Sequence, residues 1–271
     1  MNQTTEIRDI LDRLNEEQIK PVLTTEGPVL VLAGAGSGKT RVLTSRIAYL
    51  IAEKDVPPEA ILAITFTNKA ANEMKERIGQ IVDARGMWVC TIHSMCVRIL
   101  RMYAAEAGLT QNFSIYSETE RANIIKKSFQ ECDFDDEKLL KNVKWHIANA
   151  KMLGLSPAEY AEENAKEREI DDVTKVYARY QAHLRENNAL DFDDLLNEAR
   201  QLLKRNEEAR GYLGGRFRYI LVDEFQDTNA VQFEIVKLLA SVHGNLFVVG
   251  DDDQSIYRFR GANIENILNF E

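Results

Sequence analysis

The sequence predicts an α/β fold: a parallel sheet flanked by helices, with an all-helical insertion subdomain. Short apolar runs alternate with helix-periodic segments at both ends of the chain, and a charged segment without such runs separates the two ends. Polar clusters follow four of the five apolar runs. Alternation of strand and helix is typical of doubly wound sheets, whose ligands bind beyond the carboxyl ends of the strands. The polar clusters are therefore the first candidates for a functional site.

Each apolar run is expected to form a buried parallel strand. The expected strands are residues 29–33, 61–65, 87–92, 219–222 and 246–249. The segments between them have the period of helices, and a parallel sheet needs such crossovers to return the chain to its starting edge. The expected helices are residues 40–53, 68–82, 93–107 and 229–242.

The central segment has a different composition. Residues 109–206 are charged, rich in Glu, Lys, Ala and Leu, and helical in period, so we expect a helical insertion between residues 1–108 and 207–271. Helix starts are expected where a residue can cap the first turn, near Ser117, Asp135, Ser156 and Asp171. The acidic residues of the segment 191–194 could bind a metal, but helix capping and a solvated face explain them better.

The composition is that of a globular protein with one large or two moderate cores: 271 residues, 45% apolar and 28% charged. No apolar run approaches the ~18 residues of a membrane span, and residues 1–9 have no signal-peptide core. We therefore expect a cytoplasmic protein. The net charge of −9 gives no global sign of nucleic-acid binding, although local surfaces could still serve. The cysteines match no metal spacing and are expected to pack in apolar surroundings: Cys90, Cys96 and Cys132.

A glycine-rich loop joins the first strand to its helix: Ala33-Gly34-Ala35-Gly36-Ser37-Gly38-Lys39-Thr40. Glycines let several N–H groups converge on phosphate oxygens, and the following helix directs its positive dipole end at the same anion. Lys39 would reach the β- and γ-phosphates, and the Thr40 hydroxyl would coordinate Mg²⁺. Ala33 stands where this pattern usually has glycine. The loop predicts a protein that consumes ATP or GTP, against the alternative of a glycine-rich turn with an incidental lysine.

Two adjacent acids end the fourth strand, about 180 residues after the loop. Asp223 would complete the Mg²⁺ shell, and Glu224 would orient and deprotonate the attacking water. Acids at a strand end can also cap the next helix. The glycine-rich loop upstream favours the catalytic interpretation.

A third polar segment, residues 250–261, follows the fifth strand. Gln254 carries both a donor and an acceptor, so it can sense a γ-phosphate or its water. Tyr257 and Phe259 are two residues apart, so in an extended backbone both rings project to one side, with Arg258 and Arg260 on the other. This pattern predicts a stacking platform for bases beside phosphate-binding cations; the alternative is that both rings pack into the core.

Six blocks of the sequence resemble successive motifs of the superfamily 1 DNA helicases of the UvrD/Rep/PcrA type. They occur in the family's order and cover nearly the whole chain: residues 14–18, 33–40, 65–71, 91–93, 222–227 and 250–261. The resemblance implies a P-loop, RecA-like motor, with the α/β part as subdomain 1A and the insertion as subdomain 1B. The family's second motor subdomain, which supplies arginines to the transferred phosphate, is expected to be absent from these residues.

The resemblance also implies a role for each matching residue. Gln18 would read adenine, which favours ATP over GTP, and Arg41 would lie near the nucleotide. The implied catalytic residues are Lys39, Asp223, Glu224 and Gln254, with Thr40 and Asp223 holding Mg²⁺. Single-stranded DNA would contact Phe66, Asn68, Thr91, His93, Tyr257, Phe259 and Arg260. His93 has the plain alternative of starting a helix.

The implied activity is ATP-dependent unwinding of DNA by a motor that moves 3′ to 5′ along a single strand. Its partners would be single-stranded and partly duplex DNA, with repair or replication proteins. These residues alone are expected to bind ATP but to hydrolyse it very slowly, because arginines from the second motor subdomain accelerate phosphoryl transfer. One alternative is an ATP-gated nucleic-acid-binding subunit of a helicase–nuclease complex without unwinding. A small-molecule kinase is another, but it would need neither Gln18 nor the aromatic pair.

Overall fold

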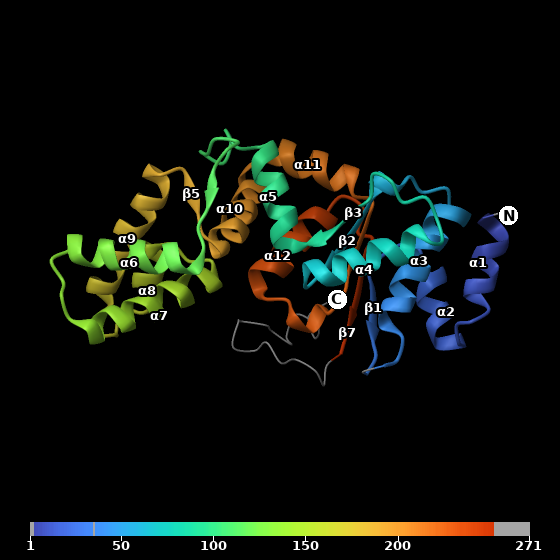
Figure 1. The fold of residues 1–271 in the computed structure, drawn as a ribbon, viewed down its shortest axis with the longest axis horizontal. Helices are drawn as coiled ribbons and strands as arrows, with labels where there is room; N and C mark the ends of the chain where they lie inside the picture. The colour runs from blue at the N-terminus through green and yellow to red at the C-terminus, as the bar shows by residue number, and fades with distance from the viewer. Residues whose placement is uncertain (1–2, 35, 252–271) are drawn as a thin grey trace. The chain divides into compact units, whose positions relative to one another are not determined.

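The computed structural model describes residues 3–34 and 36–251 (Figure 1). The chain forms two compact units, residues 1–95 with 203–271, and residues 96–202. The insertion was predicted at residues 109–206, whereas the second unit begins 13 residues earlier and ends four residues earlier. The assignment of the two units to subdomains 1A and 1B stays a prediction.

The first unit contains a five-stranded parallel sheet in the order β1-β7-β6-β2-β3. Its strands are β1 (Val29–Leu32), β2 (Ile61–Thr65), β3 (Trp88–Thr91), β6 (Tyr219–Val222) and β7 (Leu246–Gly250). The five predicted strands are confirmed, with ends that shift by one residue at most. Because all strands are parallel, the residues that follow β1, β6 and β7 lie at one edge of the sheet.

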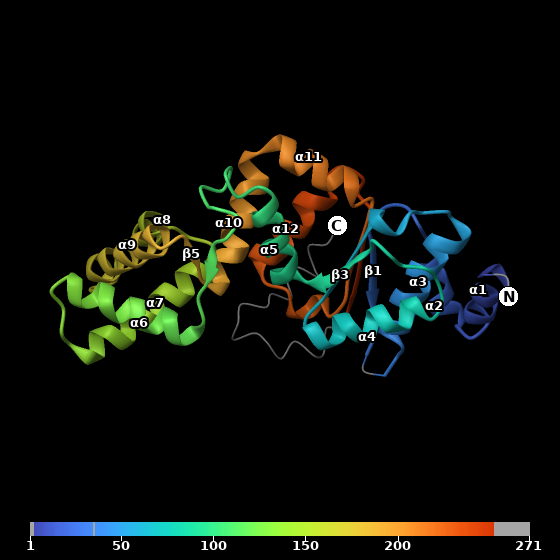
Figure 2. The same cartoon turned by 45° about the horizontal axis from the view of Figure 1, so that its top comes forward.

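Helices cover both faces of this sheet (Figure 2). One face carries α1 (Gln3–Leu11), α2 (Glu16–Leu23), α3 (Lys39–Glu53) and α4 (Asn68–Gly79), and the other carries α11 (Glu207–Arg216) and α12 (Ala230–Ala240). Successive strand residues point to opposite faces. Leu221 and Phe247 pack with Leu43 of α3 in one apolar core, while the Trp88 ring lies 5.0 Å from that of Phe217. The predicted helices 40–53, 68–82 and 229–242 are confirmed, although α4 and α12 end two or three residues early.

The remaining elements of this unit are short turns and one shared helix. The 3₁₀ turns are η1 (Pro58–Ala60), before β2, and η2 (Phe225–Asp227), after β6. Helix α5 (Ile92–Met102) follows β3 directly and is the helix predicted at residues 93–107. None of the helices in the described part of the chain is long and apolar enough to cross a membrane.

A buried arginine fastens α2 to α3. The Arg46 guanidinium, on a residue only 1% exposed, donates to the carbonyl oxygens of Pro21 at 2.6 Å and Thr25 at 3.0 Å, and also to that of Thr24. It lies 4.5 Å from the centre of the Phe247 ring, and burial lowers the pKa of Arg46 to about 10. The carbonyls at and just beyond the end of α2 lack helical partners, so Arg46 satisfies groups that are only partly buried and have no partner in the helix.

Replacing Arg46 by methionine is expected to destabilise the protein by roughly 3 kcal/mol, because three partly buried carbonyls lose their donor. Urea unfolding followed by circular dichroism measures this loss. The control is Arg8→Met, since Arg8 is an exposed residue of α1. Equal stability of the two variants would show that the Arg46 contacts contribute nothing.

The second unit is mostly helical. Its helices are α6 (Glu118–Glu131), α7 (Glu137–Leu153), α8 (Pro157–Glu163), α9 (Ile170–Glu186) and most of α10 (Phe192–Arg205). A parallel pair of two-residue strands, β4 (Ser114–Ile115) and β5 (Ala189–Leu190), was not predicted. Strands this short leave no apolar run that a sequence pattern could detect.

The predicted helix caps are confirmed where a serine begins the helix. Ser117 and Ser156 each form a capping box with the glutamate three residues later. The start predicted near Asp135 is capped by the next residue, Asp136. Helix α9 begins after Glu169, whose side chain gives no cap, and Asp171 lies in its first turn.

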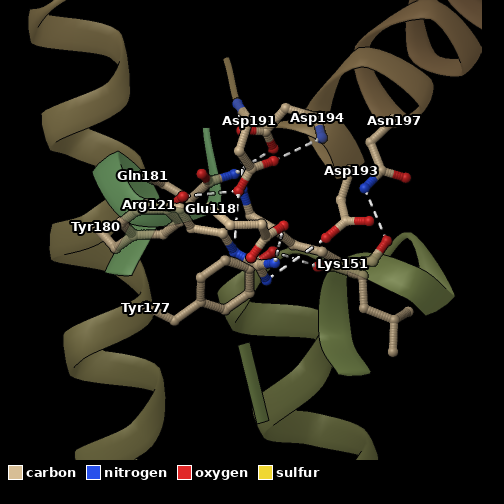
Figure 3. A network of polar contacts seen from close by, with 11 residues as sticks. Glu118, Arg121, Lys151, Tyr177, Tyr180, Gln181, Asp191, Asp193, Asp194 and Asn197 are labelled. Atoms are coloured by element: carbon tan, nitrogen blue, oxygen red, sulfur yellow. Dashed lines mark hydrogen bonds and ion pairs between the residues drawn. The ribbon is translucent and has the colours of Figure 1, made fainter. Parts of the chain in front are cut away.

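The acidic residues before and in α10 form a buried ionic cluster rather than a solvated face (Figure 3). Asp191 and Asp194 are 1% and 3% exposed, and the Lys151 ammonium lies 2.6 and 2.8 Å from their carboxylates. Asp191 also accepts a hydrogen bond from the Tyr180 hydroxyl at 2.7 Å. The capping half of the prediction is confirmed, because the Asp194 N–H donates to Asp191 at 2.9 Å. The expectation of a solvated face was wrong for both residues, because they are buried. Sequence patterns could not show this, since Lys151 lies 40 residues before Asp191 in the chain.

Candidate nucleotide and catalytic site

The Lys39 side chain lies inside the glycine-rich loop. It is 10% exposed, and its Nζ donates to the carbonyl oxygens of Ala33 at 2.7 Å and Gly34 at 3.2 Å. The same nitrogen forms an ion pair with the Asp251 carboxylate at 3.2 Å. Phosphate oxygens are acceptors of the same kind. The ammonium therefore occupies a position from which it can exchange these partners for an anion.

Gln18 lies against this loop. Its Nε2 donates to the Ser37 carbonyl at 2.8 Å, and its Oε1 accepts from the Asn15 N–H at 3.1 Å, as part of the capping box of α2. Gly38 caps α3 in the left-handed region at φ 88°, where a Cβ would lie 2.9 Å from the Gln18 amide nitrogen. Glycine is therefore required at position 38 both for its backbone and for the approach of Gln18.

Thr40 and Asp223 meet at the sheet edge although 183 residues separate them in sequence. The Thr40 hydroxyl donates to Asp223 Oδ2 at 3.5 Å. Burial raises the pKa of Asp223 to about 6, and the charge of Glu224 adds to the shift, against the opposing effects of the Thr40 hydroxyl and Lys39. A hydroxyl and a carboxylate are hard oxygen ligands that suit Mg²⁺ in a phosphate site. The residues thus fit a magnesium ion, whose charge would favour the ionised carboxylate.

Glu224 lies beside Asp223 in an unusual backbone conformation. Its φ of 52° places it in the left-handed region at the start of η2, and its N–H donates to Asp223 Oδ1 at 3.0 Å. A cavity of about 330 Å³ is lined by Thr40, Asp223, Glu224 and Phe66 among others. The cavity gives both acids access to a ligand at the carboxyl ends of β2 and β6.

Residues predicted to contact DNA lie at the ends of β2 and β3 or just after them, at the same edge of the sheet. Phe66 lines the cavity, and the exposed Asn68 begins α4 after the Thr67 cap. Thr91 is 9% exposed, and its hydroxyl both donates to the Ser94 hydroxyl and accepts from the Ser94 N–H at the start of α5. His93 is half-buried, and burial lowers its pKa to about 4, so the imidazole is neutral at pH 7.

Six of the predicted site residues have no contact with the site in the described part of the structure or lie outside that part. Arg41 is exposed in the first turn of α3. Outside the described residues lie Ala35, Gln254, Tyr257, Phe259 and Arg260. In the part of the chain that is described, no group of three or more His, Cys, Asp or Glu side chains could hold a metal ion.

A protein-family profile described as "UvrD/REP helicase N-terminal domain" matches residues 14–271. The chain belongs to this helicase family. A Staphylococcus aureus protein named "ATP-dependent DNA helicase PcrA" is 50% identical over 265 residues, which cover 97% of this chain and 36% of the relative. The Staphylococcus epidermidis protein of the same name is 48% identical over 264 residues, with the same shares covered. The chain thus spans about a third of the length of these curated relatives.

The sequence analysis gave no role to two residues that contact the predicted catalytic residues of this UvrD/REP helicase. Asp251 pairs with Lys39, and Gln226 donates to Glu224 Oε2 at 2.6 Å. Both lie within the sequence blocks of the resemblance, but neither was given a role. The signal that could have found Asp251 is its place directly after a strand. The pairing of Asp251 with Lys39 could not be predicted in this way, because the pairing depends on β7 lying beside β1.

Proposed function

We propose that this UvrD/REP helicase hydrolyses ATP and uses the energy to move along single-stranded DNA and unwind duplex. One observation carries the proposal: the Thr40 hydroxyl lies 3.5 Å from the Asp223 carboxylate, beside the loop that holds Lys39. Side chains remote in sequence thus meet at the sheet edge, and the proposal places a magnesium-bound triphosphate between them. The names of the PcrA relatives support the same activity.

Each side chain has a defined task in this mechanism. Lys39 leaves Asp251 and the loop carbonyls to bind phosphate oxygens, while the loop N–H groups and the start of α3 bind the same anion. Thr40 and Asp223 would hold Mg²⁺, which neutralises charge on the transferred phosphate. Glu224 orients the attacking water and accepts its proton. Gln254 senses the γ-phosphate, and Arg41 lies near the nucleotide.

The DNA path follows from the same sheet edge. Phe66 and Asn68 lie after β2, Thr91 ends β3 and His93 follows it, and the sequence adds Tyr257, Phe259 and Arg260. Aromatic stacking binds bases of any sequence, which suits a translocating motor. We propose 3′-to-5′ movement, because the sequence resembles helicases of that polarity.

Strand displacement by the full-length protein tests this function. Duplexes with a 3′ or a 5′ single-stranded tail are mixed with protein, ATP and Mg²⁺. We expect displacement of the 3′-tailed substrate alone. DNA-stimulated ATP turnover without any displacement would instead indicate an ATP-gated binding subunit. The 271 residues alone should bind ATP but turn it over very slowly, and strong DNA-stimulated turnover by them would contradict that proposal.

Gln18 is proposed to select adenine. Gln18→Glu keeps the acceptor for the Asn15 N–H but removes the amide donor, so we expect the preference for ATP over GTP to fall about 10- to 100-fold, the usual value of a bidentate amide contact. Competition between ATP and GTP for binding measures this ratio. The control is Glu16→Gln, in the exposed first turn of α2. An unchanged preference in Gln18→Glu would remove Gln18 from nucleotide recognition.

A further inference from the structure

The Gln226 side chain connects two separate parts of the site. It is 2% exposed; its Nε2 donates to Glu224 Oε2 at 2.6 Å, and its Oε1 accepts from the Asp251 N–H at 3.0 Å. A primary amide can donate and accept at the same time. The side chain therefore links the carboxylate after β6 to the backbone after β7.

The connection continues from Asp251 to the loop. Asp251 Oδ2 lies 3.2 Å from Lys39 Nζ, so contacts run from Lys39 through Asp251 and Gln226 to Glu224. Gly250 is needed for the close approach, because a Cβ there would lie 3.1 Å from Gln226 Oε1 and 3.4 Å from its backbone nitrogen. The first contact is tighter than most Cβ contacts in proteins, and the second is at the lower limit of ordinary van der Waals contact.

The backbone of Glu224 has contacts of its own, but they do not hold its carboxylate. A residue with a Cβ is disfavoured at φ 52°. The turn is closed by the Asp227 N–H, which donates to the Glu224 carbonyl at 3.0 Å, and by the Glu224 N–H on Asp223. These contacts fix the backbone, whereas the long side chain of Glu224 needs its own partner to hold the carboxylate in one place.

We propose that Gln226 is a positioning residue for ATP hydrolysis: it holds the Glu224 carboxylate against the end of β7, at a fixed distance from the Lys39–Asp251 pair. The inference rests on the proposed role of Glu224 as the base. Gln226 does not touch the nucleotide in this mechanism. Its loss should therefore slow the chemical step and leave ATP binding intact.

The test measures DNA-stimulated ATP hydrolysis and ATP binding in the full-length protein. Gln226→Met keeps the side-chain length without hydrogen bonds. Gln226→Glu keeps the acceptor for the Asp251 N–H but loses the donor to Glu224. For both we expect kcat to fall about 10- to 100-fold, as a misplacement near 1 Å does, with the dissociation constant for ATP within about twofold of the wild type. The control is Gln232→Met, which removes a cap contact at the start of α12.

A structural role predicts a different outcome. If ATP binding weakens and the melting temperature falls in proportion to the loss of kcat in either variant, the proposal is overturned. An unchanged kcat would also overturn it. Combining Gln226→Met with Glu224→Gln should cost no more than Glu224→Gln alone, because Gln226 acts through Glu224. If Glu224→Gln itself hydrolyses ATP normally, the proposed base is wrong. If Glu224→Gln is inactive but Gln226→Met is fully active, only the present inference fails.

Discussion

Replacing Glu224 by glutamine is expected to lower ATP turnover by about 10²- to 10⁴-fold, the usual contribution of a positioned general base. Glutamine has the same shape but cannot accept the proton of the attacking water. The phosphate contacts of Lys39 and the metal contacts of Thr40 and Asp223 remain, so ATP should bind as tightly as before. Steady-state hydrolysis and equilibrium binding of ATP, measured on the same preparation, separate the two effects.

The matched control is Glu73→Gln. Glu73 is an exposed residue of α4 that lines the same cavity, so the change removes one negative charge near the site without touching the proposed base. Near-normal turnover is expected for this variant. If the Glu73 and Glu224 variants lose activity equally, the effect comes from the charge of the cavity and not from proton transfer.

Replacing Lys151 by methionine should cost about 3–5 kcal/mol of stability at pH 7, the usual cost of leaving buried charges without their partner. Asp191 and Asp194 would lose an ammonium that lies 2.6 and 2.8 Å from their oxygens. Burial acts to raise the pKa of Asp191, but the Lys151 ammonium and the Tyr180 hydroxyl outweigh it and lower the pKa. Asp194 differs, since burial raises its pKa despite Lys151.

The pH dependence of this loss has a definite sign. Without Lys151, we expect burial to raise the pKa of both carboxyls above their unfolded values, although the Arg121 guanidinium, 3.7 Å from Asp191, opposes the rise. The folded variant then binds protons more strongly than the unfolded chain and gains stability as the pH falls. The difference between the variant and the wild type should therefore shrink between pH 7 and pH 5. Urea unfolding followed by far-ultraviolet circular dichroism at both pH values measures it. Lys126→Met, at an exposed position of α6, should unfold like the wild type. An equally mild effect of Lys151→Met would show that Lys151 does not stabilise the cluster.

Local patterns were enough to predict the sheet but not the second unit in detail. The five strands of the sheet are short apolar runs whose residues are nearly all buried, β1 excepted, and such runs stand out in a sequence. The pair β4 and β5 contributes two residues each, too few for a pattern. The burial of Asp191 and Asp194 depends on a lysine from a different helix, so composition alone favoured a solvated face.

Some residues of the candidate site could be predicted from local sequence patterns, and others could not. Lys39 and Thr40 belong to one continuous loop and helix start, and Asp223 ends a strand, so spacing along the chain predicted them. Asp251 and Gln226 acquire partners only because β7 lies between β1 and β6 and because Gly250 admits a side chain at close range. Strand order is a tertiary property, and the sequence contains no local signal for it.

A crystal structure with Mg²⁺ and a non-hydrolysable ATP analogue tests the central claim most directly. We predict one magnesium ion held by Thr40 and Asp223 between protein and phosphates, with Lys39 Nζ moved from Asp251 to the phosphate oxygens and Glu224 facing the γ-phosphate. A nucleotide bound elsewhere, or a Lys39 ammonium still paired with Asp251 while the analogue is bound, would contradict the account.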